Sequence, residues 1–259
     1  MWNFMVIGGL MTLCGLLGAL LVPAAVRVPA VDYVWPILLC GVSFICFKNT
    51  GDKIPQRSHI IVPLFLAVGL FLLSQSPAII GMKAGLSTFS YGSVMVDGAF
   101  KKSFLWKIPL LGLAVLATTM VLNRFMIRWW MEKKWPILWG ILVISFLSAA
   151  FQWPRLLNAF GVGESRYMIF TFLDLIFLSV ITMSIYLICS RILPAFLFLF
   201  LYRLAEMNFL SDSLGVYLTM YSYDSSNILF YLMRFLFLAV PAIALAYWVV
   251  KRTNKTGSR

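Results

Sequence analysis

The chain has 259 residues, of which 62% are hydrophobic and only 12% are charged, and its mean hydropathy is +0.93. A soluble domain carries about twice that charged fraction, so the composition excludes an ordinary soluble protein. The net charge of +12 does not predict a nucleic-acid partner, because the basic residues flank apolar blocks. In that position they set the topology and contact anionic headgroups of the lipid bilayer.

Apolar blocks of roughly 20 residues recur along the chain, and a block of that length crosses a bilayer as a helix. Taken in chain order, they predict eight spans, at residues 2–26, 30–47, 60–82, 104–123, 135–153, 167–190, 192–210 and 228–250. Only Arg191 and Pro194 interrupt the sixth and seventh blocks, so counts of seven or six stay open. Residues 84–100 are too polar and glycine-rich to span, and we expect an ordered loop or an interfacial segment there.

These blocks leave no segment long enough for a soluble domain. We therefore predict an all-α fold, a polytopic transmembrane helix bundle in which residues 1–259 form a single integral-membrane domain. The basic residues of the loops predict the orientation, because Lys and Arg accumulate on the cytoplasmic side. Their distribution places both termini in the cytoplasm, and the absence of an organelle-targeting presequence favours a bacterial inner (plasma) membrane.

The densest basic stretch is RFMIRWWMEKKW, residues 124–135. Its tryptophans are typical of the aromatic belt at headgroup level. We interpret Arg124, Arg128, Lys133 and Lys134 as a cytoplasmic surface that either docks a partner protein or contacts anionic lipid headgroups. The sequence explains both alternatives equally well.

Four charged residues fall inside the last three predicted spans: Asp174, Arg203, Glu206 and Arg234. At about 1.5 Å of rise per residue, Asp174 and Arg234 lie roughly 10 and 9 Å from the outer face, and Arg203 lies roughly 16 Å from the cytoplasmic face. All four therefore converge on the outer leaflet. An unpaired charge at mid-bilayer costs roughly 2.5–3.5 kcal/mol. We therefore expect the four to face inward as pairs, Asp174 with Arg203 and Glu206 with Arg234.

Two interpretations of these charges stay open. In the structural one, buried ion pairs fix helix packing, Arg203 and Glu206 satisfy each other one turn apart, or Arg203 extends to the headgroups. In the functional one, the charges form a binding site in the outer leaflet. Its arginines would hold an anionic group, and a carboxylate would couple to protons or act as a base.

No catalytic, metal or cofactor motif accompanies these charges. The four cysteines lie inside apolar blocks without a CxxC pair, and His59 is the only histidine, which argues against zinc and haem sites. P-loop, HExxH and GxSxG motifs are absent from the sequence. We therefore predict no metal and no cofactor, and the sequence does not favour an enzyme.

Three functional hypotheses follow from these observations. The leading one is a non-enzymatic polytopic inner-membrane subunit, permease-like or a scaffold component, of a larger transport, secretion or envelope complex with protein partner subunits. The second is an autonomous transporter or channel that uses the charged site of the outer leaflet. The third is a metal-independent membrane enzyme that acts on a lipid or a lipid-linked substrate.

Overall fold

The computed structural model describes residues 2–21, 34–46, 61–85, 87–88, 95–96, 99–100, 102–152, 165–206, 222–223 and 228–257. The helices in these ranges are α1 (Trp2–Leu21), α3 (Trp35–Cys46), α4 (Ile61–Lys83), α5 (Lys102–Thr119), the π-helix η2 (Met120–Ile127), α6 (Arg128–Glu132), α7 (Ile137–Phe151), α9 (Ser165–Cys189), α10 (Ile192–Glu206) and α11 (Ile228–Gly257). The strands form two antiparallel pairs of two residues each, β1 (Ser87–Thr88) with β4 (Ser222–Tyr223) and β2 (Met95–Val96) with β3 (Ala99–Phe100). The predicted all-α helix bundle is confirmed.

The helices coincide with all eight predicted apolar blocks, but they differ in length. Four stretches are long and apolar enough to cross a membrane: Ile61–Gly81, Ile108–Glu132, Phe172–Cys189 and Tyr231–Thr253. The described apolar stretches of α1, α3, α7 and α10 are shorter, at 10 to 17 residues. The membrane character is thus supported by four helices, whereas the count of eight full spans stays a prediction.

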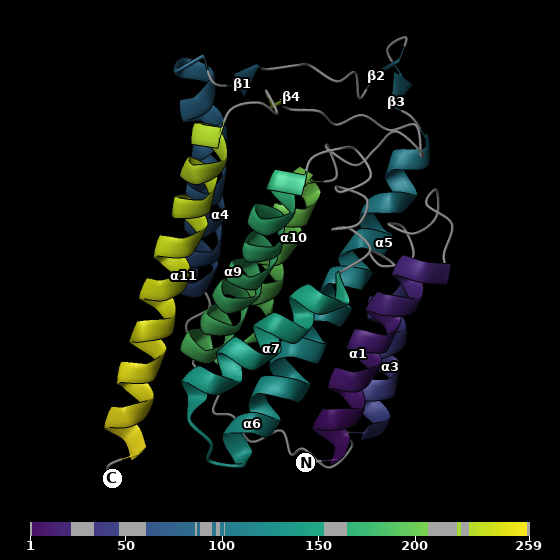
Figure 1. Cartoon of the computed structure of the whole chain (residues 1–259), viewed down its shortest axis with the longest axis vertical. Helices are drawn as coiled ribbons and strands as arrows, with labels where there is room; N and C mark the ends of the chain where they lie inside the picture. Colours follow the sequence, from purple (N-terminus) through teal and green to yellow (C-terminus); the bar gives the residue numbers. More distant parts are fainter. Residues whose placement is uncertain are drawn as a thin grey trace.

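Helix α9 lies at the centre of the bundle, where it packs against α7, α10 and α11. Helices α4 and α11 form one edge of the bundle, and α1 and α3 form the other (Figure 1). The first turn of α1, the whole of α6 and the last turn of α11 share one end, which we call the lower end (Figure 1). The opposite end, where α9 and α11 begin, is the upper end.

Helices α5, η2 and α6 form one continuous rod from Lys102 to Glu132. The predicted span ends at Asn123, because Arg124 and Arg128 follow it. The helix continues because the apolar residues between the two arginines pack into the bundle, while the arginine side chains are only partly buried. Long basic side chains can cover apolar surface with their stems and keep their charges at its edge.

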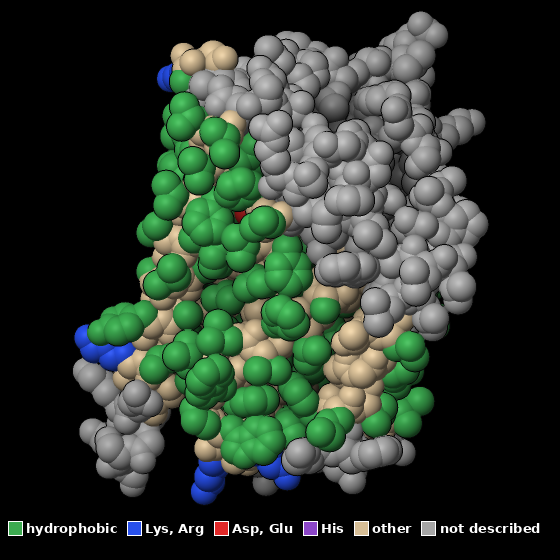
Figure 2. Space-filling view, viewed as in Figure 1, with side chains coloured by type: hydrophobic (Ala, Val, Ile, Leu, Met, Phe, Trp, Pro, Cys, Tyr) green, Lys and Arg blue, Asp and Glu red, His purple; other side chains and the backbone are tan. Residues whose placement is uncertain are grey.

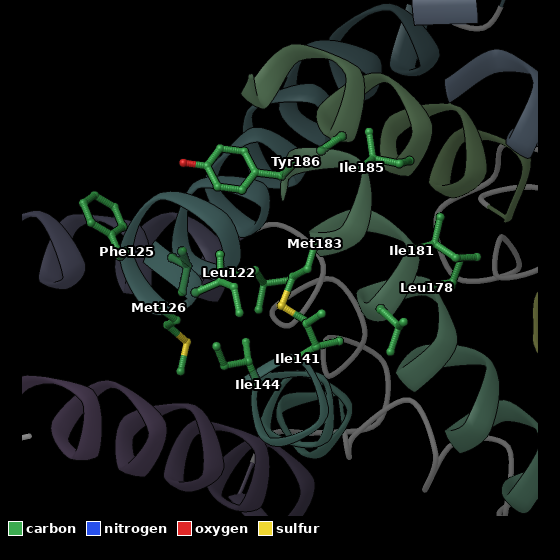
Figure 3. Close-up of a cluster of buried hydrophobic side chains, with 14 of the residues drawn as sticks. Leu122, Phe125, Met126, Ile141, Ile144, Leu178, Ile181, Met183, Ile185 and Tyr186 are labelled. Atoms are coloured by element: carbon green, nitrogen blue, oxygen red, sulfur yellow. The ribbon is translucent and has the colours of Figure 1, made fainter. Parts of the chain in front are cut away.

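The main core cluster includes residues from most of the helices, and at its centre η2, α7 and α9 contribute close-packed apolar side chains. Leu122 and Met126 of η2 meet Ile141 and Ile144 of α7 beside Met183 of α9 (Figure 3). All five are at most 1% exposed. Lipid tails are as apolar as these residues, so the association depends on close contact and interhelical hydrogen bonds more than on escape from water. One such hydrogen bond joins α9 to α7, where the Ser179 hydroxyl donates to the Ser148 hydroxyl at 3.0 Å.

On the face shown in Figure 2 the described residues present mostly hydrophobic side chains, and Lys and Arg side chains lie toward the lower part of this face and at its upper left edge. Exposed apolar residues recur at helical spacing along α11, for example Leu232, Leu236, Val240 and Ile243, each at least 41% exposed. A helix with such a face is stable only where lipid or another apolar surface covers it.

Candidate functional site

The predicted charged residues lie on three of the helices that begin or end at the upper end. Asp174 is in α9, Arg203 and Glu206 are in α10, and Arg234 is in α11. Because α9 and α11 run downward from the upper end and α10 runs upward toward it, the three segments meet in the upper half of the bundle (Figure 1). Helix α9 packs against both α10 and α11.

One guanidinium joins all three helices. The Nε atom of Arg234 lies 3.0 Å from Oδ2 of Asp174, and Nη2 of Arg234 donates a hydrogen bond to the Tyr202 hydroxyl at 3.0 Å. The Asp174 side chain is only 9% exposed, and that of Arg234 is 21% exposed. We call Asp174, Tyr202 and Arg234 the upper joint. Its bonds are charge-assisted and lie in a low-dielectric interior, where they are stronger than in water.

Arg203 lies beside Tyr202 on α10 and is 9% exposed. It takes part in further interactions within the structure. Its burial argues against the alternative in which this side chain extends to the headgroups, because an extended arginine exposes its guanidinium. Arg203 is therefore a buried basic residue of α10, next in sequence to Tyr202 of the upper joint.

The structure joins two of the predicted charged residues in a pair that was not assigned in advance. Asp174 was expected to pair with Arg203, and Glu206 with Arg234, and the structure describes an ion pair between Asp174 and Arg234. The pair of Asp174 with Arg203 stays a prediction. The signal for this pair was present, because Asp174 and Arg234 have nearly equal predicted depths of about 10 and 9 Å. The side chain of Glu206 lies outside the described part of the structure, so its pairing with Arg234 stays a prediction.

Comparisons with protein-family models, with curated proteins and with solved structures found no match for this chain. The case for a function therefore rests on the contacts of the upper joint and on those of the lower end.

The basic stretch 124–134 does not form one exposed surface. Arg124 and Arg128 are partly buried, and Arg128 Nε lies 3.4 Å from Oε1 of Glu132. Lys133 and Lys134 are exposed, and Lys133 Nζ lies 5.9 Å from the centroid of the Trp129 ring. Arg124, Arg128, Lys133 and Lys134 were predicted to dock a partner or to contact lipid. Of these four residues, the two lysines are the exposed ones.

The neighbouring tryptophans are structural. Trp129 and Trp130 are 7% and 9% exposed, and Phe4 of α1 stacks on Trp129 with ring centroids 5.0 Å apart. Trp135 meets Trp130 edge-on at 4.8 Å, and the Trp130 indole N–H donates to the Pro136 carbonyl at 3.1 Å. We call Phe4, Trp129, Trp130 and Trp135 the lower joint. The expected headgroup belt therefore includes two rings that are buried between helices.

Tyr202 was not among the predicted site residues. The available signal was a phenol hydroxyl within an otherwise apolar run of α10, because buried tyrosine hydroxyls usually find a hydrogen-bond partner. Among the described residues, no group of three or more His, Cys, Asp or Glu side chains is placed to hold a metal ion. The arrangement can therefore hold helices together or present guanidinium groups to an anion.

Proposed function

We propose that this chain is a non-enzymatic, multi-pass subunit, permease-like or a scaffold component, of a larger transport, secretion or envelope complex. We place it in a bacterial inner membrane with both termini in the cytoplasm. The observation that carries the proposal is the upper joint, in which Arg234 binds Asp174 and Tyr202 at once. These buried polar groups are used to tie three helices together, which favours a rigid framework.

A second observation supports a partner. Helix α7 has 15 residues, about 22 Å, whereas the hydrocarbon core is about 30 Å thick. Its outer side exposes apolar residues, among them Trp139 at 61% and Phe146 at 56%. A short helix of this kind is accommodated by thinning of the bilayer or by association with neighbouring helices. We infer the second arrangement, with a helix of a partner subunit beside α7.

The experiment is a purification of the tagged chain from its native membrane in a gentle detergent, with mass spectrometry of everything that comes with it. A stoichiometric partner is the expected result. The matched variant is Phe146→Ala with Trp139→Ala, which should reduce the yield of that partner and leave the bundle folded. Recovery of the chain alone, or only with itself and lipid, would overturn the subunit proposal.

One observation favours a second candidate, an autonomous transporter of an anionic group. Two arginines, Arg203 on α10 and Arg234 on α11, and one carboxylate, Asp174 on α9, are buried or largely buried in the described structure. Guanidinium groups match carboxylate and phosphate oxygens in geometry. Exchange of the Asp174 and Arg234 side chains separates the candidates, because a framework tolerates the swap. A substrate site would lose uptake into proteoliposomes even though the swapped protein folds.

A further inference from the structure

Three exposed lysines point outward at the lower end of the bundle: Lys133 and Lys134 after α6, and Lys251 in α11. The arginines beside them are already engaged. Arg128 pairs with Glu132, and Nη1 of Arg252 donates to the Ile188 carbonyl at 3.2 Å, which caps the end of α9. Among the described residues, Glu132 is the only acidic residue at this end. The lysines therefore carry positive charge that no described carboxylate offsets.

Aromatic rings accompany the basic residues on both helices. At the end of α6, Lys133 lies over the Trp129 ring. In α11, the Nζ atom of Lys251 lies 6.0 Å from the centroid of the Tyr247 ring. The guanidinium of Arg252 lies 5.7 Å from the centroid of the Trp248 ring. Tyr247 and Trp248 are 66% and 46% exposed. Rings of this kind, with a basic group at their outer edge, are typical of the headgroup level of a bilayer.

The position of these residues favours lipid over a soluble partner. The basic side chains at the lower edge border the hydrophobic outer face directly (Figure 2). Trp135, 40% exposed, is followed by Leu138 and Trp139, 43% and 61% exposed, and in α11 Tyr247 follows Ile243, 64% exposed. An apolar face thus borders the lysines on both helices, the arrangement expected where ammonium groups lie near the lipid phosphates.

We propose that Lys133, Lys134 and Lys251 form a rim that binds anionic phospholipid headgroups in preference to zwitterionic ones. Each ammonium group is a compact charge with three donors for phosphate oxygens. The net negative charge of the headgroup provides the preference, and a lysine near an anionic membrane surface contributes about fivefold in affinity. The rim would hold the lower end against the leaflet that is richer in anionic lipid. This inference does not depend on the subunit role.

The test uses the full chain in mixed micelles with an equimolar supply of phosphatidylglycerol and phosphatidylcholine, and bound lipid is counted by native mass spectrometry. The chain is expected to retain phosphatidylglycerol preferentially, and the preference should weaken as salt is added because the site is exposed. The variant with Lys133→Gln, Lys134→Gln and Lys251→Gln should lose most of this preference, about fivefold for each lysine. The three single variants are measured as well, so that the contribution of each lysine to the lipid preference can be determined even if the triple variant does not fold.

Lys83→Gln is the matched control, because Lys83 is an exposed lysine at the opposite end of the bundle, on α4. It should leave the lipid preference unchanged, and Lys→Arg changes in the rim should preserve it. An unchanged preference in the triple variant would overturn the proposal, as would an equal loss in Lys83→Gln. Loss of a bound protein from native membranes with no change in lipid preference would show a protein interface instead, and would also overturn it.

Discussion

The upper and lower joints connect helices of the same bundle by different physical means. At the upper joint, one buried guanidinium connects α9, α10 and α11 through an ion pair and a hydrogen bond. At the lower joint, aromatic rings from α1, α6 and the turn before α7 pack against one another. The single interhelical polar bond described among the lower rings is the one from Trp130 to a backbone carbonyl.

This difference predicts how each joint fails. In a charged joint, removal of one group leaves the other charge buried without its partner, which is strongly destabilising. Exchange of the two groups keeps the ion pair, so we expect it to cost less. An aromatic joint is stabilised by many weak van der Waals contacts between closely fitting rings. It therefore tolerates the loss of a nearby charge, but not a larger side chain that must fit between the rings. The following changes test this contrast, from the largest expected effect to the smallest.

The largest effect is expected for Arg234→Met. The substitution keeps a long side chain but leaves the Asp174 carboxylate without this ion pair in the low-dielectric interior. Breaking a buried pair in this way costs about 3–5 kcal/mol in the free energy of unfolding. The measurement is thermal and chemical unfolding of the purified chain in detergent. The double variant with Asp174→Arg and Arg234→Asp should recover a large part of the loss, and a double variant no better than the single one would contradict a structural ion pair.

At the lower joint, the critical change adds one methyl group. A Cβ at Gly140 would lie 2.7 Å from Cδ1 and 2.8 Å from Cγ of Trp130, whose ring is fixed by its contacts with Phe4 and Trp135. Gly140→Ala is therefore expected to destabilise the bundle by about 1–3 kcal/mol through overpacking. Gly41→Ala is the control, because a Cβ at Gly41 meets no atom within 4 Å. The control should be neutral or slightly stabilising, since alanine favours helix. Equal losses in both variants would show that the Trp130 contact is not the cause.

The contrast between the joints also shows what the sequence could predict. Continuous apolar blocks are a strong signal, so the helices and the all-α fold were predictable from hydropathy alone. The buried charges were predictable as a group, because inserting four of them unpaired is costly. The pair of Asp174 with Arg234 was not assigned in advance, because it depends on which faces of α9 and α11 meet, and hydropathy does not encode rotation about a helix axis.

The lower joint was harder to predict. Tryptophans next to arginines match the pattern of a headgroup belt, and only the packing of α1 and α7 against α6 shows that Trp129 and Trp130 are buried. The importance of Gly140 is likewise invisible in sequence, because it comes from the close approach of a ring that precedes it by ten positions. Contacts of this kind are set by tertiary packing, whereas the blocks that predicted the helices are local.

A smaller effect at the upper joint is expected for Tyr202→Phe. The change removes only the hydroxyl that accepts a hydrogen bond from Arg234, and it keeps the ring that packs beside Phe198. Interhelical hydrogen bonds in membranes contribute about 0.5–1.5 kcal/mol, so the expected loss is well below that of Arg234→Met. The same unfolding measurement applies. A loss as large as that of Arg234→Met would mean that the hydroxyl, and not the ion pair with Asp174, dominates the joint.

The smallest effect is expected for Glu132→Gln at the lower end. Glu132 is 43% exposed and pairs with Arg128 one turn earlier on the same helix, at 3.4 Å. The Arg128 side chain is only 11% exposed, but solvent reaches the Glu132 carboxylate and screens the pair. Ion pairs at i,i+4 contribute only about 0.3–0.5 kcal/mol when solvent screens them. The unfolding midpoint of this variant should therefore stay close to that of the unaltered chain, even though it removes the one described ion pair beside the lower joint. Comparing the unfolding midpoints of Glu132→Gln and Arg234→Met in the same detergent and salt tests most directly whether the two joints differ. If Glu132→Gln were as destabilising as Arg234→Met, electrostatics would hold the lower end as well, and the distinction between a charged joint and an aromatic one would fail.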